Sequence, residues 1–254
     1  MRKIILITIF FFGLFAVCDV YAQTTQNSVS TPVGLKIQFD TGGGPEDYSQ
    51  SIKILLLLTA LSLAPSAIIM CTSFTLILIV LGMLRQALGT QSEPQGQILS
   101  AISLFLTIFI MAPVWTKIND TAIKPYTAKQ ITQQQAWDLG IQPVREFMLK
   151  QTGEKELALF VDMSGRKFAT VNDLSLDVLI PAFMVSELKT AFQMGFLIFL
   201  PFIVIDMVVS TILMSLGMMM LPPMMISMPI KILFFVLADG WTLLIKGIVT
   251  SFSL

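Results

Sequence analysis

The sequence has no histidine and only two cysteines, Cys18 and Cys71. The absence of histidine removes the commonest metal ligand and the commonest general base. The two cysteines do not have the paired spacing of a metal site or a redox motif. The sequence also lacks a phosphate-binding glycine-lysine loop, a serine-hydrolase elbow and the glycine-flanked aspartates of membrane proteases. We therefore expect no cofactor, no metal and no enzymatic activity.

Charge is also scarce. Only 13% of the 254 residues are charged, whereas an average soluble domain has about 25%. The 16 basic and 16 acidic residues cancel, so no basic excess points to nucleic acid as a partner. Hydrophobic residues make up 55% of the chain and gather into runs long enough to cross a bilayer, which takes about 20 residues as a helix. This composition predicts an all-α membrane protein.

The first 22 residues have the pattern of a secretory signal peptide. Arg2 and Lys3 precede the apolar stretch Ile4–Val17, and a small-residue site then ends at Ala22. We expect cleavage between Ala22 and Gln23, which would leave the mature N-terminus in the periplasm. An uncleaved N-terminal anchor is the alternative. A lipoprotein modified at Cys18 fits less well, because Val17 is bulky where such sites have a small residue.

Residues 23–51 are polar and carry Gly42-Gly43-Gly44-Pro45, so they are expected to form a flexible periplasmic tether. Within the tether, Leu35–Phe39 alternates apolar and polar residues and could form a short strand.

Four apolar blocks follow, and they predict about four helical membrane segments, several of them broken by proline. The blocks are Ile52–Leu84, Ile98–Val114, Phe192–Leu216 and Met224–Ile245. They divide the chain into residues 52–116, with the first two membrane segments, and 181–254, with the last two. Pro65 makes the first block either one kinked helix or a tight pair of shorter ones. An even number of crossings places the middle segment and the C-terminus in the periplasm with the mature N-terminus.

The middle segment, residues 117–180, is the one part that resembles a soluble protein. Half of the chain's charged residues lie in it. Thr132 and Gln135 have the spacing of a capping box, Gly140 is expected to end that helix, and Pro143 is expected to begin the next. About 60 residues is near the lower limit for a stable domain. We expect this small helical periplasmic segment to pack against its own copies or against partner subunits.

Charged residues within or beside the last two apolar blocks are the first candidates for function. A charge at bilayer depth costs at least about 2.5 kcal/mol unless it is paired or hydrated. One hypothesis is that these residues form a proton or ion path. The other, favoured by the similar numbers of both signs, is that they pair between helices or between subunits. The residues are Glu187, Lys189, Asp206, Lys231 and Asp239, with Lys246 close by.

Methionine is the second candidate feature. Eight of the 16 methionines lie between Met207 and Met228, and Met218, Met219 and Met220 stand between Gly217 and Pro222-Pro223. Glycine and proline break a helix, so the triplet is expected on a turn. Unbranched thioether side chains fill irregular gaps and adapt to changing partners. On composition alone, ordinary apolar filling of a membrane helix is the favoured explanation.

A series of distinctive segments runs through the chain from Thr72 to Trp241. They are Thr72–Thr75, Leu84–Thr90, Pro143–Met148, Pro181–Phe192, Gly195-Phe196, Leu200–Phe202, Asp206, Leu216–Met220, Pro222-Pro223 and Asp239–Trp241. Together they resemble the signature of the FliP family, whose members are subunits of the flagellar type III protein export gate. The resemblance covers about residues 50–254. Leu76 departs from it, because the family usually has an arginine after the Ser-Phe-Thr run.

The resemblance implies a multi-pass protein of the bacterial inner membrane and the flagellar basal body. It implies partners as well: FliQ and FliR, further copies of the chain, other membrane subunits of the export apparatus and unfolded flagellar export substrates. It also implies that Met218, Met219 and Met220 form a gasket that closes the pore. Two alternatives are a stand-alone transporter or proton channel and an assembly scaffold that does not line the pore.

Overall fold

The computed structural model describes residues 45–90, 94–166, 168, 173–218 and 222–252. The predicted signal peptide, its cleavage site at Ala22 and Gln23, the possible strand at residues 35–39 and the tether up to Gly44 lie outside these residues. The chain divides into two units, Met1–Ile54 and Leu55–Leu254. The described part of the first unit, residues 45–54, is helical.

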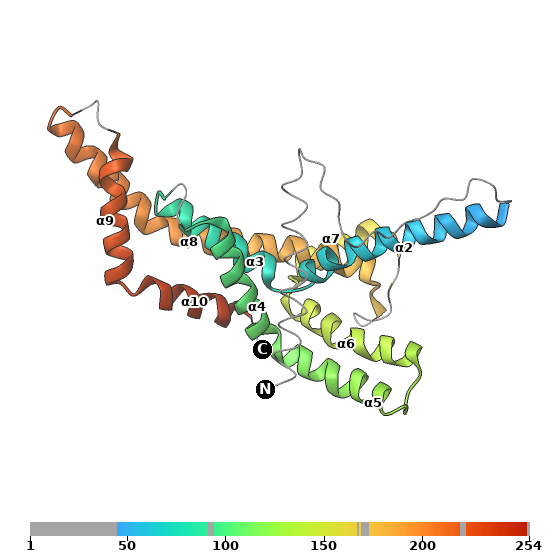
Figure 1. The fold of residues 1–254 in the computed structure, drawn as a ribbon. Helices are drawn as coiled ribbons and strands as arrows, with labels where there is room; N and C mark the ends of the chain where they lie inside the picture. Colours follow the sequence, from blue (N-terminus) through green and yellow to red (C-terminus); the bar gives the residue numbers. More distant parts are fainter. Residues whose placement is uncertain (1–44, 91–93, 167, 169–172, 219–221, 253–254) are drawn as a thin grey trace, which may run out of the picture. The chain divides into compact units, whose positions relative to one another are not determined.

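The described residues are mostly helical and contain no strand (Figure 1), so the all-α prediction is confirmed. The elements are α2 (Pro45–Met70), α3 (Phe74–Ala87), α4 (Gly96–Ile118), η1 (Asn119–Ile123), α5 (Lys124–Thr127), α6 (Gln133–Gln151), α7 (Glu154–Ser164), α8 (Leu176–Ser215), α9 (Pro223–Leu237) and α10 (Gly240–Ser251).

Among the described residues, two helices are long and apolar enough to cross a membrane. They are the continuous helix Gly96–Thr127 and the 40-residue helix α8. Two bent pairs reach the same criterion together: Leu55–Met70 with α3, at 66°, and α9 with α10, at 67°. The four apolar blocks thus correspond to two candidate spans, or to four if each bent pair counts as one. The fourth block is two helices rather than the single helical segment expected.

The first apolar block is a pair of helices, but its break does not fall at Pro65 as predicted. Helix α2 continues through Pro65 and ends at Met70. At the break, the hydroxyl of Thr72 donates to the carbonyl of Ile69 at 2.8 Å and accepts from the N–H of Phe74 at 3.4 Å. These bonds replace backbone hydrogen bonds that a continuing helix would make, so the side chain of Thr72 favours the turn.

Helix α6 corrects a second prediction. The capping box is present, with the hydroxyl of Thr132 accepting from the N–H of Gln135 and the side chain of Gln135 accepting from the N–H of Thr132. However, Gly140 does not end the helix and Pro143 does not begin another, because α6 runs through both to Gln151. A Cβ at Gly140 would lie 3.4 Å from the Cβ of Ala122. The glycine therefore allows close packing of α6 on η1.

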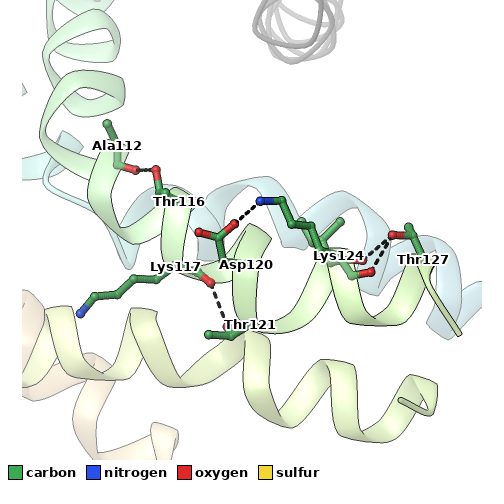
Figure 2. A network of polar contacts seen from close by, with 8 residues as sticks. Ala112, Thr116, Lys117, Asp120, Thr121, Lys124 and Thr127 are labelled. Carbon is green, nitrogen blue, oxygen red and sulfur yellow. Dashed lines mark hydrogen bonds and ion pairs between the residues drawn. The ribbon is translucent and has the colours of Figure 1, made fainter. Parts of the chain in front are cut away.

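The helix that begins with α4 changes to a π-helical turn at η1 and then continues as α5 (Figure 2). The π turn ends two residues before Pro125, whose ring in a regular α-helix would crowd the carbonyl of Thr121. Single π turns of this kind occur within α-helices. Hydroxyls of Thr116 and Thr121 donate to carbonyls one turn earlier, and Lys124 pairs with Asp120 at 2.6 Å (Figure 2).

Helix α8 packs against α3, α6, α7 and α9, and the main core lies along it. It begins at Leu176, well before the predicted apolar block at Phe192. Phe147 of α6 contacts Phe183 of α8 edge-on, with ring centroids 6.1 Å apart, and stacks on Phe252 at 6.2 Å. The middle segment is therefore part of the same core and not a separate domain.

Helix α3 crosses α8 at Gly195, which is buried. A Cβ added there would lie 2.4 Å from the Cε of Met83 and 3.2 Å from its Cβ. The flexible end of Met83 could move aside, but its Cβ can move only with α3, so a side chain at position 195 would push the two helices slightly apart. Leu76, the departure from the family pattern, is buried in the same core.

We predict that Gly195→Ala destabilises the chain by about 1–3 kcal/mol, because overpacking forces α3 away from α8. Gly82→Ala on the facing helix is the matched control: a Cβ there meets nothing within 4 Å, so it should be neutral or slightly stabilising. Adding Met83→Ala to Gly195→Ala should restore part of the loss. Thermal unfolding in detergent measures all three variants, and equal stability of Gly195→Ala and Gly82→Ala would contradict the close crossing.

Candidate functional site at the α8–α9 hairpin

The tip of the α8–α9 hairpin is defined by the glycine and the prolines that the sequence places there. Gly217 has a φ of 73°. Its N–H donates to the carbonyl of Met214, and the N–H of Met218 donates to the carbonyl of Leu213. This pair of bonds is a Schellman motif, which ends α8. Pro223 occupies the first turn of α9. Met218 is the last residue of the motif and is 42% exposed, whereas Met219 and Met220 lie outside the described residues.

Other methionines of the hairpin pack against the end of α3. A Cβ at Gly89 would lie 3.9 Å from the Cγ of Met224 and 4.0 Å from the Cγ of Met228. Gly89 has a φ of 79° and lies two residues beyond the end of α3. The base of the methionine-rich turn is thereby placed beside the C-terminal end of α3.

An ion pair joins α9, α8 and α3 close to the same point. The ammonium of Lys231 lies 2.6 Å from Oδ2 of Asp206 and donates to the carbonyl of Ala87 at 3.1 Å. The side chain of Lys231 is only 4% exposed, whereas that of Asp206 is 43% exposed. A buried ammonium is tolerated only with partners of this kind. The contact supports pairing between helices for these two predicted site residues.

Glu187 and Lys189 lie far from this pair. Glu187 is 19 residues before Asp206 in the same helix, which corresponds to roughly 28 Å along its axis. No ionisable residue lies between Lys189 and Asp206. Glu187 is 3% exposed, and its Oε2 has no hydrogen-bond partner among the described residues. The structure therefore does not bring the predicted acidic residues of α8 together.

Lys189 pairs with a residue that the sequence did not single out. Its ammonium lies 2.7 Å from Oε1 of Glu156 in the first turn of α7. The hydrogen bond from Lys189 holds the pKa of the Glu156 carboxyl below its ordinary value. The stabilisation is therefore present above that ordinary value and is lost only as the pH falls through the lowered pKa. No sequence pattern links the two residues, which are 33 positions apart.

Asp239 forms the corner between α9 and α10. It has a φ of 50°, its carbonyl accepts from the N–H of Leu243, and its Oδ1 accepts from the hydroxyl of Thr242 at 3.0 Å. Asp239 makes no ion pair within the described part of the chain. A Cβ at Gly240 would lie 2.2 Å from the ring of Phe235, so the corner needs glycine next. Asp239 therefore shapes the backbone at the corner between α9 and α10, a role that its charge alone did not suggest.

An apolar cavity of about 470 Å³ lies between α3, α8, α9 and α10. Its lining residues carry no ionisable side chain, so it has no group to hold a polar substrate. The described residues also contain no cluster of three or more acidic or cysteine side chains that could hold a metal ion.

Long apolar helices, a hairpin with a methionine-rich tip and a buried interhelical ion pair fit a multi-helix membrane protein. Comparison with known sequences identifies the family. The model of the FliP family matches residues 57–248, and the chain belongs to that family.

Three relatives illustrate the similarity, and each is named "Flagellar biosynthetic protein FliP". The protein of Bacillus subtilis (strain 168) is 49% identical over 217 residues, which cover 85% of this chain and 98% of the relative. The protein of Pectobacterium carotovorum subsp. carotovorum is 48% identical over 210 residues, covering 82% and 81%. The protein of Borreliella burgdorferi (strain ATCC 35210 / DSM 4680 / CIP 102532 / B31) is 43% identical over 250 residues, covering 95% and 97%.

We predict that removing either partner of the Asp206–Lys231 pair destabilises the chain, and that the two losses are unequal. Asp206→Asn leaves a buried ammonium without its counter-ion, which costs about 3–5 kcal/mol. Lys231→Met leaves a carboxylate that is partly exposed, so its loss should be smaller. The double variant should be more stable than Asp206→Asn alone. Lys246→Met, at an exposed lysine, is the control. Unfolding in detergent measures each variant, and simple additivity of the two losses would argue against the pair.

For Asp239 we predict that the backbone conformation matters more than the charge. Asp239→Asn should keep the corner, because asparagine tolerates a positive φ, whereas Asp239→Ala should cost about 1–2 kcal/mol. Thermal unfolding and the yield of folded protein distinguish the two variants. If Asp239 acts instead through an ion pair with another subunit, asparagine and alanine should reduce recovery of the assembled complex equally.

Proposed function

We propose that this chain is a core, non-enzymatic subunit of the flagellar type III protein export gate. The relatives at 43–49% identity, all named as flagellar biosynthetic proteins, support a role in flagellar biosynthesis. The long apolar helices support a place in a membrane, and we assign it to the bacterial inner membrane at the flagellar basal body. Together with FliQ, FliR and further copies of itself, the chain would form a pore for unfolded flagellar subunits. Other membrane subunits of the export apparatus complete the set of proposed partners.

The single observation that carries the proposal is the methionine-rich tip of the α8–α9 hairpin. A pore for an extended polypeptide must exclude water when idle and must yield to side chains of every size. Unbranched thioether side chains meet both demands, since they are apolar and repack around a guest. Met218 is exposed and is the last residue of the motif that ends α8. In the proposal, Met218, Met219 and Met220 of each copy together form a gasket.

The anchoring of the hairpin is consistent with this role. Lys231 joins α9 to both α8 and the end of α3, and Met224 and Met228 pack at Gly89 close to that end. The base of the hairpin is thus fixed, while Met218 is exposed within the described part of the chain. The methionine side chains would then rearrange around the substrate while helices α8 and α9 keep their positions.

A stand-alone proton channel has less support. The acidic residues Glu187 and Asp206 are separated by roughly 28 Å of helix, and the stretch between Lys189 and Asp206 carries no ionisable group. A continuous proton path along α8 would need polar groups or water in that stretch. Asp206 is also occupied by its contact with Lys231.

We predict that replacing Met218, Met219 and Met220 together by alanine makes the idle gate leak small ions, because the shorter side chains leave a gap between copies. The measurement is ion leak across the membrane of cells that express the variant with its partner subunits. Replacing the three residues by leucine is the matched control, since leucine keeps the apolar volume and should keep the idle gate closed.

The comparison requires equal recovery of the complex with FliQ and FliR from each strain under mild detergent conditions. If the alanine variant assembles, shows no added leak and exports normally, the gasket is contradicted and the methionines only fill apolar space. That result would support the alternative in which the chain is an assembly scaffold. A chain that purifies without these partners and conducts protons in liposomes would instead support the channel.

A further inference from the structure

Helix α7 depends on α8 for its position. It packs mainly on α8, and none of its residues is fully buried. Leu157 is the α7 side chain that packs against the main core. A helix of 11 residues is also too short to be stable by itself in water. Specific contacts at its first turn must therefore contribute to holding it.

The first of these contacts is the hydroxyl of Ser186 on α8. It accepts from the N–H of Gly153 at 2.9 Å and donates to the carbonyl of Gln151 at 3.1 Å. Gly153 precedes α7 and Gln151 ends α6, so one hydroxyl joins three helices. Ser186 is only 5% exposed, and the loss of its hydroxyl would leave the two backbone groups without this partner.

The second contact is the ion pair between Lys189 and Glu156, at 2.7 Å. Residues three positions apart on a helix lie on the same face, so Ser186 and Lys189 both meet the first turn of α7. The fit there is close, because a Cβ at Gly153 would lie 2.3 Å from Oε2 of Glu156 and 3.6 Å from the hydroxyl of Ser186.

We propose that Ser186 and the Lys189–Glu156 pair form a two-point clasp that fixes the first turn of α7 on α8, and that α7 undocks as a unit when the clasp is broken. The clasp lies where the charged part of α8 ends, since no ionisable residue follows Lys189 until Asp206. Ser186 and Lys189 are therefore positioning residues: they set the place of the α6–α7 segment against the apolar stretch of α8. This assignment does not depend on the export function.

Charge reversal of the full chain in detergent tests the clasp. Amide hydrogen exchange of residues 154–164 in Lys189→Glu or Glu156→Lys should accelerate by about two- to fivefold, the range expected for one exposed ion pair. The double reversal restores opposite charges and should bring exchange back to within twofold of the original. Exchange in residues 190–215 of α8 should change in none of these variants and serves as the internal reference.

Two further sets of variants make the test specific. Ser186→Ala should accelerate exchange in α7 and at the end of α6, whereas Ser186→Thr keeps the hydroxyl and should not. The ion pair Lys117–Glu146 between α4 and α6, at 3.3 Å, is the matched control, and its reversal should leave α7 unchanged. The proposal is wrong if the single reversals leave amide exchange of α7 unchanged, or if exchange in the double reversal is as fast as in the single reversals.

Discussion

The ammonium of Lys231 is the constraint on which the arrangement around the hairpin depends. It lies on a helix with no other ionisable residue and is almost fully buried, so it is stable only where oxygen atoms surround it. The chain supplies a carboxylate from α8 at Asp206 and a backbone carbonyl from the end of α3 at Ala87. Satisfying this one charge brings three helices together and fixes the base of the methionine-rich turn.

Helix α8 separates two polar sites by an apolar stretch. Near its N-terminal end, Ser186 and Lys189 contact α7, and toward its C-terminal end Asp206 contacts Lys231. Between them the helix meets α3 at Gly195, where the absence of a side chain permits a close crossing. Directional polar contacts thus hold α7, α9 and the C-terminal end of α3, whereas close apolar packing at Gly195 sets how the rest of α3 crosses α8. In an export gate this division would keep the apolar stretch free for lipid or for neighbouring subunits.

The positions of helix ends show where reasoning from sequence succeeded and where it did not. The capping box at Thr132 and the turn at Gly217 were predictable, because the side-chain hydrogen bonds and the positive φ that make them are local. Pro65, Gly140 and Pro143 were expected to break or begin helices, yet the helices continue through them. In α6, the contact of Gly140 with Ala122 and the burial of Pro143 against other helices outweigh the local preference.

By itself, the sequence determined that the chain is helical, rich in segments of membrane-spanning length and a member of the FliP family. These properties depend on composition, on runs of neighbouring residues and on long motifs, all of which are visible in the sequence without knowledge of how the helices pack. Only the tertiary structure decided which charges meet. Lys231 pairs with Asp206 across 25 positions, and Lys189 pairs with Glu156 across 33, while Glu187 is buried without a partner for its Oε2 among the described residues. Ion pairs form between atoms a few ångströms apart, and that proximity depends on how distant helices pack.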